Sequence, residues 1–211
     1  MDPYPLKRRS DLHLARKAWH FGGVMLMVLV HHFATRDRSF QILAVATFLF
    51  VAADIVRQHA PALNKILVAA FGPLMREHER DGFAGTTYLL LGTFVILLVF
   101  PKTIVSLTLL FLAVADPLAS LIGIRFGKDK LIGSKSLQGT MAAFIACTAI
   151  SAAYFAATGA MTERILMVSL LAGLVGAVSE LIPLGKLDDN FSFPLLASSL
   201  LWLLFNVFGG L

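Results

Sequence analysis

The stretch from residue 123 to residue 140, GIRFGKDKLIGSKSLQGT, gathers lysines and glycines between two long apolar runs. Glycine lets a backbone approach a ligand closely, a helix N-terminus offers free N–H groups, and ammonium groups neutralise negative charge. Because KSLQGT resembles a helix start, we expect this stretch to bind phosphate groups. The candidate residues are Gly123, Gly127, Lys128, Lys130, Lys135, Ser136, Gly139 and Thr140.

This stretch is not a Walker A loop. GIRFGKD is one residue short of the G-x-x-x-x-G-K spacing and has Asp129 where Ser or Thr should follow. Its four cations, Arg125 included, could also form an ordinary cytoplasmic loop that touches anionic lipid. The glycines and the helix start favour phosphate binding over that alternative.

Two carboxylates lie inside apolar runs, Asp116 in TIVSLTLLFLAVADPLASLIGIRF and Glu180 in ILMVSLLAGLVGAVSELIP. A carboxylate at membrane depth costs about 2.5–3.5 kcal/mol on insertion scales, so it is a functional candidate. We also expect Pro117 to disfavour helical geometry at Asp116. Together with Lys135, the two acids are the predicted catalytic residues. The alternative is a structural kink whose carboxylate is satisfied within the protein.

A third acidic group follows Glu180 in the segment GKLDDNFSFP, where Asp188, Asp189 and Asn190 are adjacent. Hard oxygen ligands suit Mg²⁺, which is often held by one or two carboxylates together with substrate phosphates. The sequence therefore predicts a divalent metal site at these residues. The alternative is a solvated turn with an N-cap for the last helix, since Asp and Asn favour both.

Two weaker groups complete the candidate nucleotide site. Lys17 and His20 lie where the first apolar run begins, and Glu77 lies in REHERDGFAGTTYLLLG before a helix start rich in Gly and Thr. Basic residues at such a place are usually topological anchors, and acidic residues before a helix are usually caps. We include Lys17, His20 and Glu77 as candidate contacts to the nucleotide.

The elements that must position these residues are membrane helices. Apolar residues make up 57% of the 211 residues and charged residues 15%, against about 25% charged in ordinary globular proteins. We predict an all-α, polytopic transmembrane helical bundle of about seven spans. The spans are 18–34, 40–56, 84–100, 103–126, 138–158, 163–184 and 193–208, and we expect residues 60–75 to form an interfacial or re-entrant helix instead.

The distribution of cations predicts the orientation of the bundle. With seven spans, Arg36, Arg38, Lys102 and Arg164 fall on one side and the other Lys and Arg residues on the opposite side. The positive-inside rule then places the N-terminus in the cytoplasm. Residues 1–211 are predicted to form one integral-membrane domain whose site lies on cytoplasmic loops 57–83, 127–137 and 185–192. In a prokaryote the membrane would be the plasma or inner membrane.

The residues resemble a known family, the CTP-dependent lipid-alcohol kinases, which include dolichol, phytol and farnesol kinases and the CTP-using diacylglycerol kinase. The similarity is carried by ARKAWHFGG, REHERDGFAGTTYLLLG, ADPLASLIGIRFGKDKLIGSKSLQGT and SELIPLGKLDDNFSFPL, and the last two segments are the specific ones. It implies transfer of the γ-phosphoryl group of CTP to the hydroxyl of a membrane lipid, with a divalent cation such as Mg²⁺. Carried over by position, it implies roles for Asp116, Lys128, Lys135, Ser136, Gly139, Glu180, Asp188, Asp189 and Asn190.

The expected partners are a lipid alcohol, a nucleoside triphosphate and the bilayer, and nothing in the sequence indicates nucleic-acid binding. The chain lacks the extra N-terminal spans of dolichol kinases, which leaves the acceptor open among polyprenol, phytol, farnesol and diacylglycerol. A cytidylyltransferase that makes a CDP-activated lipid is the nearest rival function. A transporter is a rival function of another class. Against it, the loops that carry the polar residues of this chain are all expected on one side of the membrane.

Overall fold

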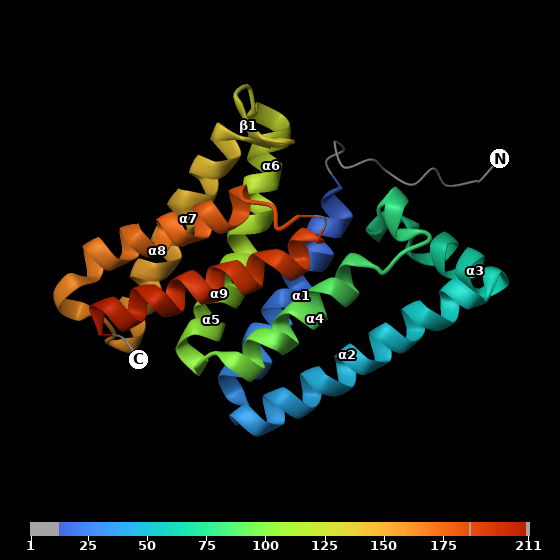
Figure 1. The fold of residues 1–211 in the computed structure, drawn as a ribbon, viewed down its shortest axis with the longest axis horizontal. Coiled ribbons are helices and arrows are strands. Elements are labelled where there is room, and N and C mark those ends of the chain that lie inside the picture. The colour runs from blue at the N-terminus through green and yellow to red at the C-terminus, as the bar shows by residue number, and fades with distance from the viewer. Residues whose placement is uncertain (1–12, 186, 210–211) are drawn as a thin grey trace.

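The computed structural model describes residues 13–185 and 187–209, so residues 1–12 and Lys186 of the cation distribution lie outside the described residues. The predicted all-α, polytopic membrane bundle is confirmed (Figure 1). The helices are α1 (Leu14–Phe33), α2 (Arg36–His59), α3 (Pro61–Phe71), α4 (Gly85–Val99), α5 (Lys102–Leu110), α6 (Asp116–Phe126), α7 (Leu137–Thr158), α8 (Ile165–Leu181) and α9 (Asp189–Phe208). The shorter elements are the turns η1 (Gly72–Leu74), η2 (Glu77–Glu79), η3 (Phe111–Ala115) and η4 (Thr162–Arg164) and the strands β1 (Lys130–Ile132) and β2 (Lys135–Ser136).

Five helical segments of the described chain are long and apolar enough to cross a membrane: Arg36–His59, Lys102–Phe126, Leu137–Thr158, Thr162–Leu181 and Asp189–Phe208. The other two predicted spans correspond to α1 and α4. Helix α1 carries Arg16 and Lys17 in its first turn, and α4 has 15 residues. At 1.5 Å per residue, α4 is about 22 Å long, short of a hydrocarbon core of about 30 Å.

The segment Lys102–Phe126 forms the centre of the bundle. The side chains that are completely buried in this segment include four of α5 and one of η3: Ile104, Val105, Leu107, Leu109 and Phe111. Helices α1, α7 and α9 pack around this segment, while α2 lies at the edge of the bundle along α4 (Figure 1). Because the central segment is surrounded by helices, the polar residues that follow in α6 are held by protein on several sides.

Small residues let the outer helices approach one another closely. A Cβ at Gly173 or Gly176 of α8 would collide with Thr148 or Cys147 of α7, and a Cβ at Gly92 of α4 would lie 2.9 Å from Cγ of Pro194 in α9. Membrane helices have no hydrophobic driving force to pair in lipid, so close backbone packing takes its place. These contacts hold α8 close to α7 and α4 close to α9.

The helix remains continuous through Asp116, so the prediction that Pro117 disfavours helical geometry there was wrong. Asp116 has φ −62° and ψ −53°, and its N–H donates to the carbonyl of Phe111, one residue further back than in an α-helix. This π-helical turn absorbs the proline, which has no N–H to donate. The next carbonyl, that of Leu112, instead contacts Nε2 of His20 at 3.0 Å. The break in the backbone ladder thereby ties α1 to the central segment.

A short antiparallel hairpin, β1–β2, joins α6 to α7, with Lys130 paired to Ser136. Gly133 turns the hairpin with φ +55°, a conformation that glycine adopts without strain. The ends of α6 and α7 are close enough that a Cβ at Gly139 would lie 2.8 Å from the carbonyl oxygen of Ala119. Gly127 is equally confined, because a Cβ there would lie 2.8 Å from Cβ of Ser136. The hairpin therefore has a fixed position at one end of the bundle.

Candidate active site

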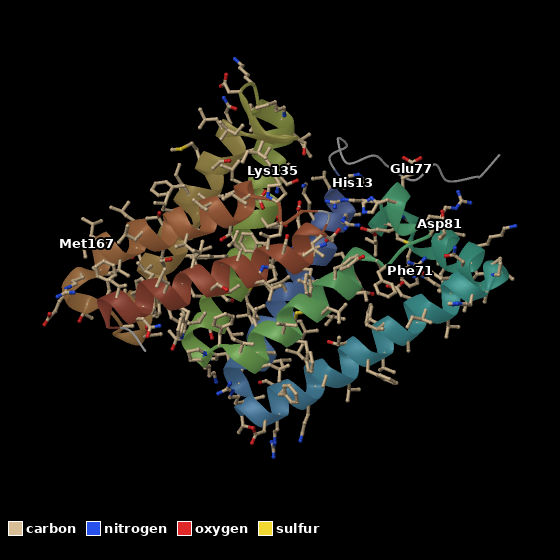
Figure 2. All side chains as sticks on the ribbon, viewed as in Figure 1. His13, Phe71, Glu77, Asp81, Lys135 and Met167 are labelled. Atoms are coloured by element: carbon tan, nitrogen blue, oxygen red, sulfur yellow. The ribbon has the colours of Figure 1, made fainter. Side chains whose placement is uncertain are left out.

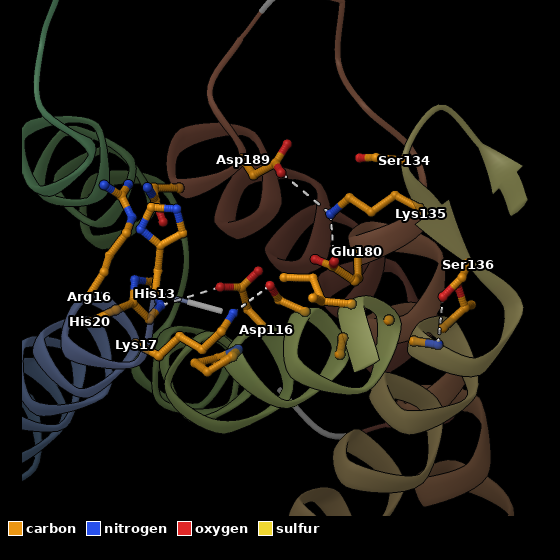
Figure 3. Close-up of a pocket in the computed structure, with 18 of the residues that line it drawn as sticks. His13, Arg16, Lys17, His20, Asp116, Ser134, Lys135, Ser136, Glu180 and Asp189 are labelled. Atoms are coloured by element: carbon orange, nitrogen blue, oxygen red, sulfur yellow. Dashed lines mark hydrogen bonds and ion pairs between the residues drawn. The ribbon is translucent and has the colours of Figure 1, made fainter. Parts of the chain in front are cut away.

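A pocket of about 460 Å³ lies at the end of the bundle where α1, α6, the hairpin and the starts of α7 and α9 meet (Figure 3). It brings together most of the residues predicted from the sequence. The predicted residues that line it are Lys17, His20, Asp116, Gly123, Lys130, Lys135, Ser136, Gly139, Thr140, Glu180, Asp189 and Asn190. His13, Arg16, Arg76, Ser120 and Ser134 also line it. Figure 2 shows the place of Lys135 and His13 in the whole molecule.

Lys135 extends from β2 into this pocket between two carboxylates. Its Nζ lies 2.5 Å from Oε1 of Glu180 and 3.4 Å from Oδ2 of Asp189 (Figure 3). Glu180 comes from the last turn of α8 and Asp189 from the first turn of α9, so one ammonium group joins the hairpin to both helices. Such a group is positioned to attract an anion into the pocket.

The charge state of Lys135 follows from these neighbours. Burial alone lowers the pKa of Lys135, but the nearby carboxylates, Glu180 foremost, outweigh burial and raise that pKa above its ordinary value. The raised pKa of Lys135 stabilises the folded state. This stabilisation is complete at pH values below the pKa of an unfolded lysine, about 10.4, and is lost as the pH rises through the higher pKa of the folded state. Lys135 is therefore a cation throughout the neutral pH range.

Asp116, at the start of α6, lies between the basic residues of α1 and Glu180 (Figure 3). Its Oδ2 lies 3.6 Å from Nε2 of His20, the same nitrogen that contacts the carbonyl of Leu112. One turn further along α6, the hydroxyl of Ser120 accepts a 2.6 Å hydrogen bond from Lys17. The basic residues of α1 thus lie directly beside Asp116, as Figure 3 shows.

The hairpin supplies the remaining polar wall. The Ser136 hydroxyl caps α7 by accepting a hydrogen bond from the N–H of Gly139 at 3.3 Å, and Nζ of Lys130 donates to the carbonyl of Ser134 at 3.3 Å. Gly123 and Gly139 serve chiefly to let α6 and α7 meet. A Cβ added to either glycine would lie less than 4 Å from the Cα atom of the other. The helix start that the sequence predicted at KSLQGT is present.

Four of the residues predicted for the site do not line this pocket. Lys128 is exposed on the hairpin, Gly127 packs against Ser136, and Glu77 is exposed in η2. The fourth, Asp188, caps α9 by accepting from the N–H of Asn190 at 2.9 Å, and its side chain lines a neighbouring pocket. Of these two cavities, Asp188 lines the neighbouring one, whereas Asp189 lines both.

Carboxylates converge on the pocket, but they do not form an all-protein metal cage. Within residues 13–185 and 187–209, no group of three or more His, Cys, Asp or Glu side chains is placed to hold one ion. Asp189 and Asn190 in this pocket instead suit a Mg²⁺ ion that substrate phosphates also hold, because that ion usually takes one or two carboxylates, phosphate oxygens and water.

Comparison with known proteins gives the family. The chain is 31% identical over 208 residues to CTP-dependent diacylglycerol kinase 1 of Schizosaccharomyces pombe, a match that covers 90% of this chain and 93% of that protein. The chain belongs to the family of CTP-dependent lipid kinases. CTP-dependent diacylglycerol kinase 1 of Saccharomyces cerevisiae is 29% identical over 206 residues, 88% of this chain and 71% of that protein.

A more distant relative of this lipid kinase is the dolichol kinase of Saccharomyces cerevisiae, 26% identical over 201 residues, which are 89% of this chain but 36% of the longer protein. No family model matches the kinase sequence, and no solved structure matches it. The family predicted from the sequence segments is confirmed by these relatives.

The sequence did not single out the ion pair that holds Arg16, a residue lining the kinase pocket. Arg16 of α1 binds the buried Glu79 of η2, with NH2 2.7 Å from Oε1 and NH1 2.9 Å from Oε2. Gly85 leaves room for this pair, because a Cβ there would lie 3.1 Å from Oε1 of Glu79 and collide with Arg16. Glu79 and Gly85 lie in the segment REHERDGFAGTTYLLLG. Its glycines, which allow a close approach of the backbone, were the available signal in the sequence.

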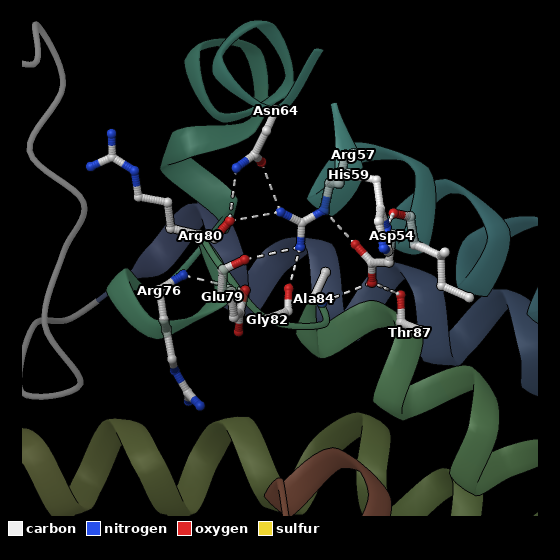
Figure 4. A network of polar contacts seen from close by, with 11 residues as sticks. Asp54, Arg57, His59, Asn64, Arg76, Glu79, Arg80, Gly82, Ala84 and Thr87 are labelled. Atoms are coloured by element: carbon white, nitrogen blue, oxygen red, sulfur yellow. Dashed lines mark hydrogen bonds and ion pairs between the residues drawn. The ribbon is translucent and has the colours of Figure 1, made fainter. Parts of the chain in front are cut away.

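A second group that sequence analysis missed is centred on Arg57, at the end of α2 (Figure 4). Its Nε lies 2.5 Å from Oδ1 of Asp54, and its two NH groups donate to Oδ1 of Asn64 and to the carbonyls of Glu79, Arg80 and Gly82. Asp54 in turn accepts from the N–H of Ala84 and the hydroxyl of Thr87. All five donors of the guanidinium are used, so Arg57 fixes the loop that carries Glu79 to Arg16.

Arg57→Lys is expected to destabilise the kinase although the charge is kept. Lysine cannot reproduce five donors in a planar fork, so buried carbonyls of the loop lose their partners. The loss of one such partner costs about 1–3 kcal/mol, and a net loss near 2 kcal/mol would lower the thermal unfolding midpoint by about 4–8 °C. Thermal unfolding in detergent measures the effect. Arg38→Lys, at an exposed position near the start of α2, is the control, and equal midpoints for the two variants would contradict the role of Arg57.

Proposed function

We propose that this kinase transfers the γ-phosphoryl group of CTP to the hydroxyl of diacylglycerol, at the pocket between α1, α6 and the hairpin. The observation that carries the proposal is the meeting of Asp116, on a segment long and apolar enough to span a membrane, with the cations of α1 and the hairpin in one cavity. The nucleotide and acceptor are those in the name of the relatives that cover most of the chain.

The cations of the pocket bind and orient the triphosphate. Phosphoryl transfer is largely a matter of positioning and of neutralising the charge of the phosphoryl group. Lys135 meets the transferred group from the hairpin, and Lys130 and Arg16 extend the positive wall on either side. Glu180 keeps the ammonium of Lys135 in place through their 2.5 Å contact, so its role is to position a catalytic group.

Asp116 accepts the proton of the lipid hydroxyl. The hydroxyl oxygen bonds to the γ-phosphorus, the bond from that phosphorus to the β–γ bridging oxygen breaks, and CDP leaves. His20 lies 3.6 Å from the carboxylate and is held by the carbonyl of Leu112, so it fixes Asp116 in this orientation. A diacyl chain can stay in the bilayer while its hydroxyl reaches α6 at the membrane boundary.

Asp189, together with Asn190, is positioned to hold a divalent cation that accompanies the nucleotide. A Mg²⁺ ion held there would supply positive charge that offsets the negative charge of the phosphates. Asp189 lines the pocket at the N-terminus of α9, and Asn190 is buried beside it. Asp188, which the sequence grouped with these two, has its carboxylate in the helix cap.

An acceptor panel tests the proposed activity. Purified protein is incubated with CTP, Mg²⁺ and, in separate reactions, diacylglycerol, dolichol, phytol or farnesol, and both the lipid and the nucleotide products are identified. The expected products are phosphatidate and CDP. Phosphorylation of a polyprenol alone would contradict the acceptor, and release of pyrophosphate with transfer of the cytidylyl group to a lipid would contradict kinase chemistry.

We further propose that the pocket faces the cytoplasm. The described loops rich in cations all lie at the pocket end, while Arg164 lies at the other end of α8. In right-side-out vesicles, Arg164→Cys is therefore expected to react with a membrane-impermeant thiol reagent, and Leu131→Cys only after permeabilisation. Both positions are exposed, and the native Cys147 is buried. Labelling of Leu131→Cys in sealed vesicles would reverse the orientation.

A further inference from the structure

A second cavity adjoins the active-site pocket, between the loop that precedes α4 and the loop that precedes α9. Its volume is about 240 Å³, and it is lined by Arg76, His78, Gly82, Phe83, Tyr88, Leu187, Asp188 and Asp189. Arg76 and Asp189 line both cavities. A ligand held in the first pocket can therefore extend past these two residues into the second.

The size and the aromatic wall of this cavity suit a flat ring. Pockets that enclose a whole small-molecule ligand measure about 300–1,000 Å³, so this one suits a fragment of a larger ligand. Phe83 and Tyr88 form one wall, with ring centroids 6.0 Å apart and planes inclined by 59°. Aromatic side chains stack on nucleobases of every kind, because each base has a π-face.

Polar groups at the rim of the cavity match the hydrogen-bonding edge of cytosine. Asp188 uses Oδ1 to cap α9, and its second oxygen can accept from an exocyclic amine. A carboxylate accepting from N4 is the usual partner of cytosine, whereas uracil offers an acceptor at that position. Arg76 and His78 supply donors for the ring and carbonyl acceptors of the base.

We propose that this second cavity binds the cytosine base of the nucleotide, with Phe83 and Tyr88 beside the ring and Asp188 reading its amino group. The triphosphate then runs past Arg76 and Asp189 toward Lys135. This assignment rests on the proposed function for the identity of the nucleotide, and it makes Asp188 a specificity residue of the nucleotide site.

Asp188→Asn tests the reading of the base while keeping the fold. Asparagine caps helices as well as aspartate does, so α9 keeps its start. The amide, however, can turn a donor toward the base, which suits the O4 acceptor of uracil. We expect CTP to bind about tenfold more weakly and UTP more tightly than in the wild type. Asp81→Asn, an exposed position of the same loop region outside both cavities, is the control.

Phe83→Leu tests the stacking wall independently. Leucine keeps an apolar side chain but removes the π-face, so CTP and UTP are both expected to bind about tenfold more weakly. Phe71→Leu, at an exposed position of α3, is the matched control. Binding of CTP, UTP and inorganic triphosphate to the detergent-solubilised proteins is measured by calorimetry, and all variants should bind inorganic triphosphate like the wild type.

Unchanged CTP and UTP binding in both Asp188→Asn and Phe83→Leu would overturn the base site. Because binding is measured without lipid, this result is separate from a failure of the proposed function. That failure would appear as a wild-type protein that binds CTP but phosphorylates no lipid.

Discussion

Lys135→Ala is expected to lower kcat/KM for CTP about a thousandfold. The variant removes the ammonium that neutralises the transferred phosphoryl group, and charge-stabilising groups of this kind contribute about 10²–10⁵ in rate. It also leaves Glu180 and Asp189 without the cation they share. Steady-state phosphorylation of diacylglycerol at several CTP concentrations measures both kcat and KM.

Lys128→Ala is the matched control for Lys135→Ala. Lys128 belongs to the same connection between α6 and α7 and has the same charge, but it is exposed and does not line the pocket. We expect its kcat/KM to stay within about threefold of the wild type, since exposed charges act weakly. Equal losses in the two variants would reduce the hairpin to a basic surface that attracts nucleotides or lipid, with no distinct catalytic lysine.

Asp116→Asn is expected to lower kcat by about 10²–10⁴ while CTP binding stays within about twofold. Asparagine keeps the shape of the side chain and can still contact His20, but it cannot take a proton from the lipid hydroxyl. Because the defect lies in the chemical step, kcat and kcat/KM should fall together. Single-turnover phosphorylation and equilibrium binding of CTP separate the two effects.

The control for Asp116→Asn is Asp37→Asn, an exposed carboxylate in the first turn of α2 at the other end of the bundle. It should retain wild-type turnover. Near wild-type turnover in Asp116→Asn as well would mean that this carboxylate only holds α6 against α1. A loss of CTP binding equal to the loss of turnover would instead assign Asp116 to nucleotide binding.

The sequence was sufficient to predict the helical bundle and to predict that most of the site residues lie close together. Long apolar runs determine where helices cross, and a continuous chain of such helices must return to the same end after every second crossing. For that reason Asp116, Lys135 and Glu180, from three different segments, could be expected at one end. The helix start at Ser136 was also predictable, because the chain there changes from loop composition to an apolar run.

Other parts of the site depend on contacts that no local pattern specifies. At the π-helical turn before Asp116, the carbonyl of Leu112 contacts His20, which lies almost a hundred residues earlier in the chain. The pairing of Arg16 with Glu79 likewise joins two separate segments, and the neighbouring Glu77 offers the same chemistry in the sequence. The choice between them is made by the fold of the loop around Arg57.

The group of Asp188, Asp189 and Asn190 illustrates how capping divides adjacent residues. Both interpretations of these residues, metal ligand and N-cap, were open from the sequence, and the structure gives the cap to Asp188. Asp188 precedes α9 with extended geometry and lines the second cavity, whereas Asp189 begins the helix and lines both cavities. Residue type predicted the chemistry of this group, and helix geometry determines which member reaches which ligand.

The measurement that tests the proposed reaction most directly follows labelled phosphate from CTP into lipid. Wild-type protein is incubated with diacylglycerol and CTP labelled either in the γ-phosphate or in the α-phosphate, and the lipid is extracted. A kinase with the chemistry proposed for Asp116 and Lys135 should yield labelled phosphatidate from γ-labelled CTP and no labelled lipid from α-labelled CTP. Labelled lipid from α-labelled CTP alone would contradict it, because the cytidylyl group would then have been transferred.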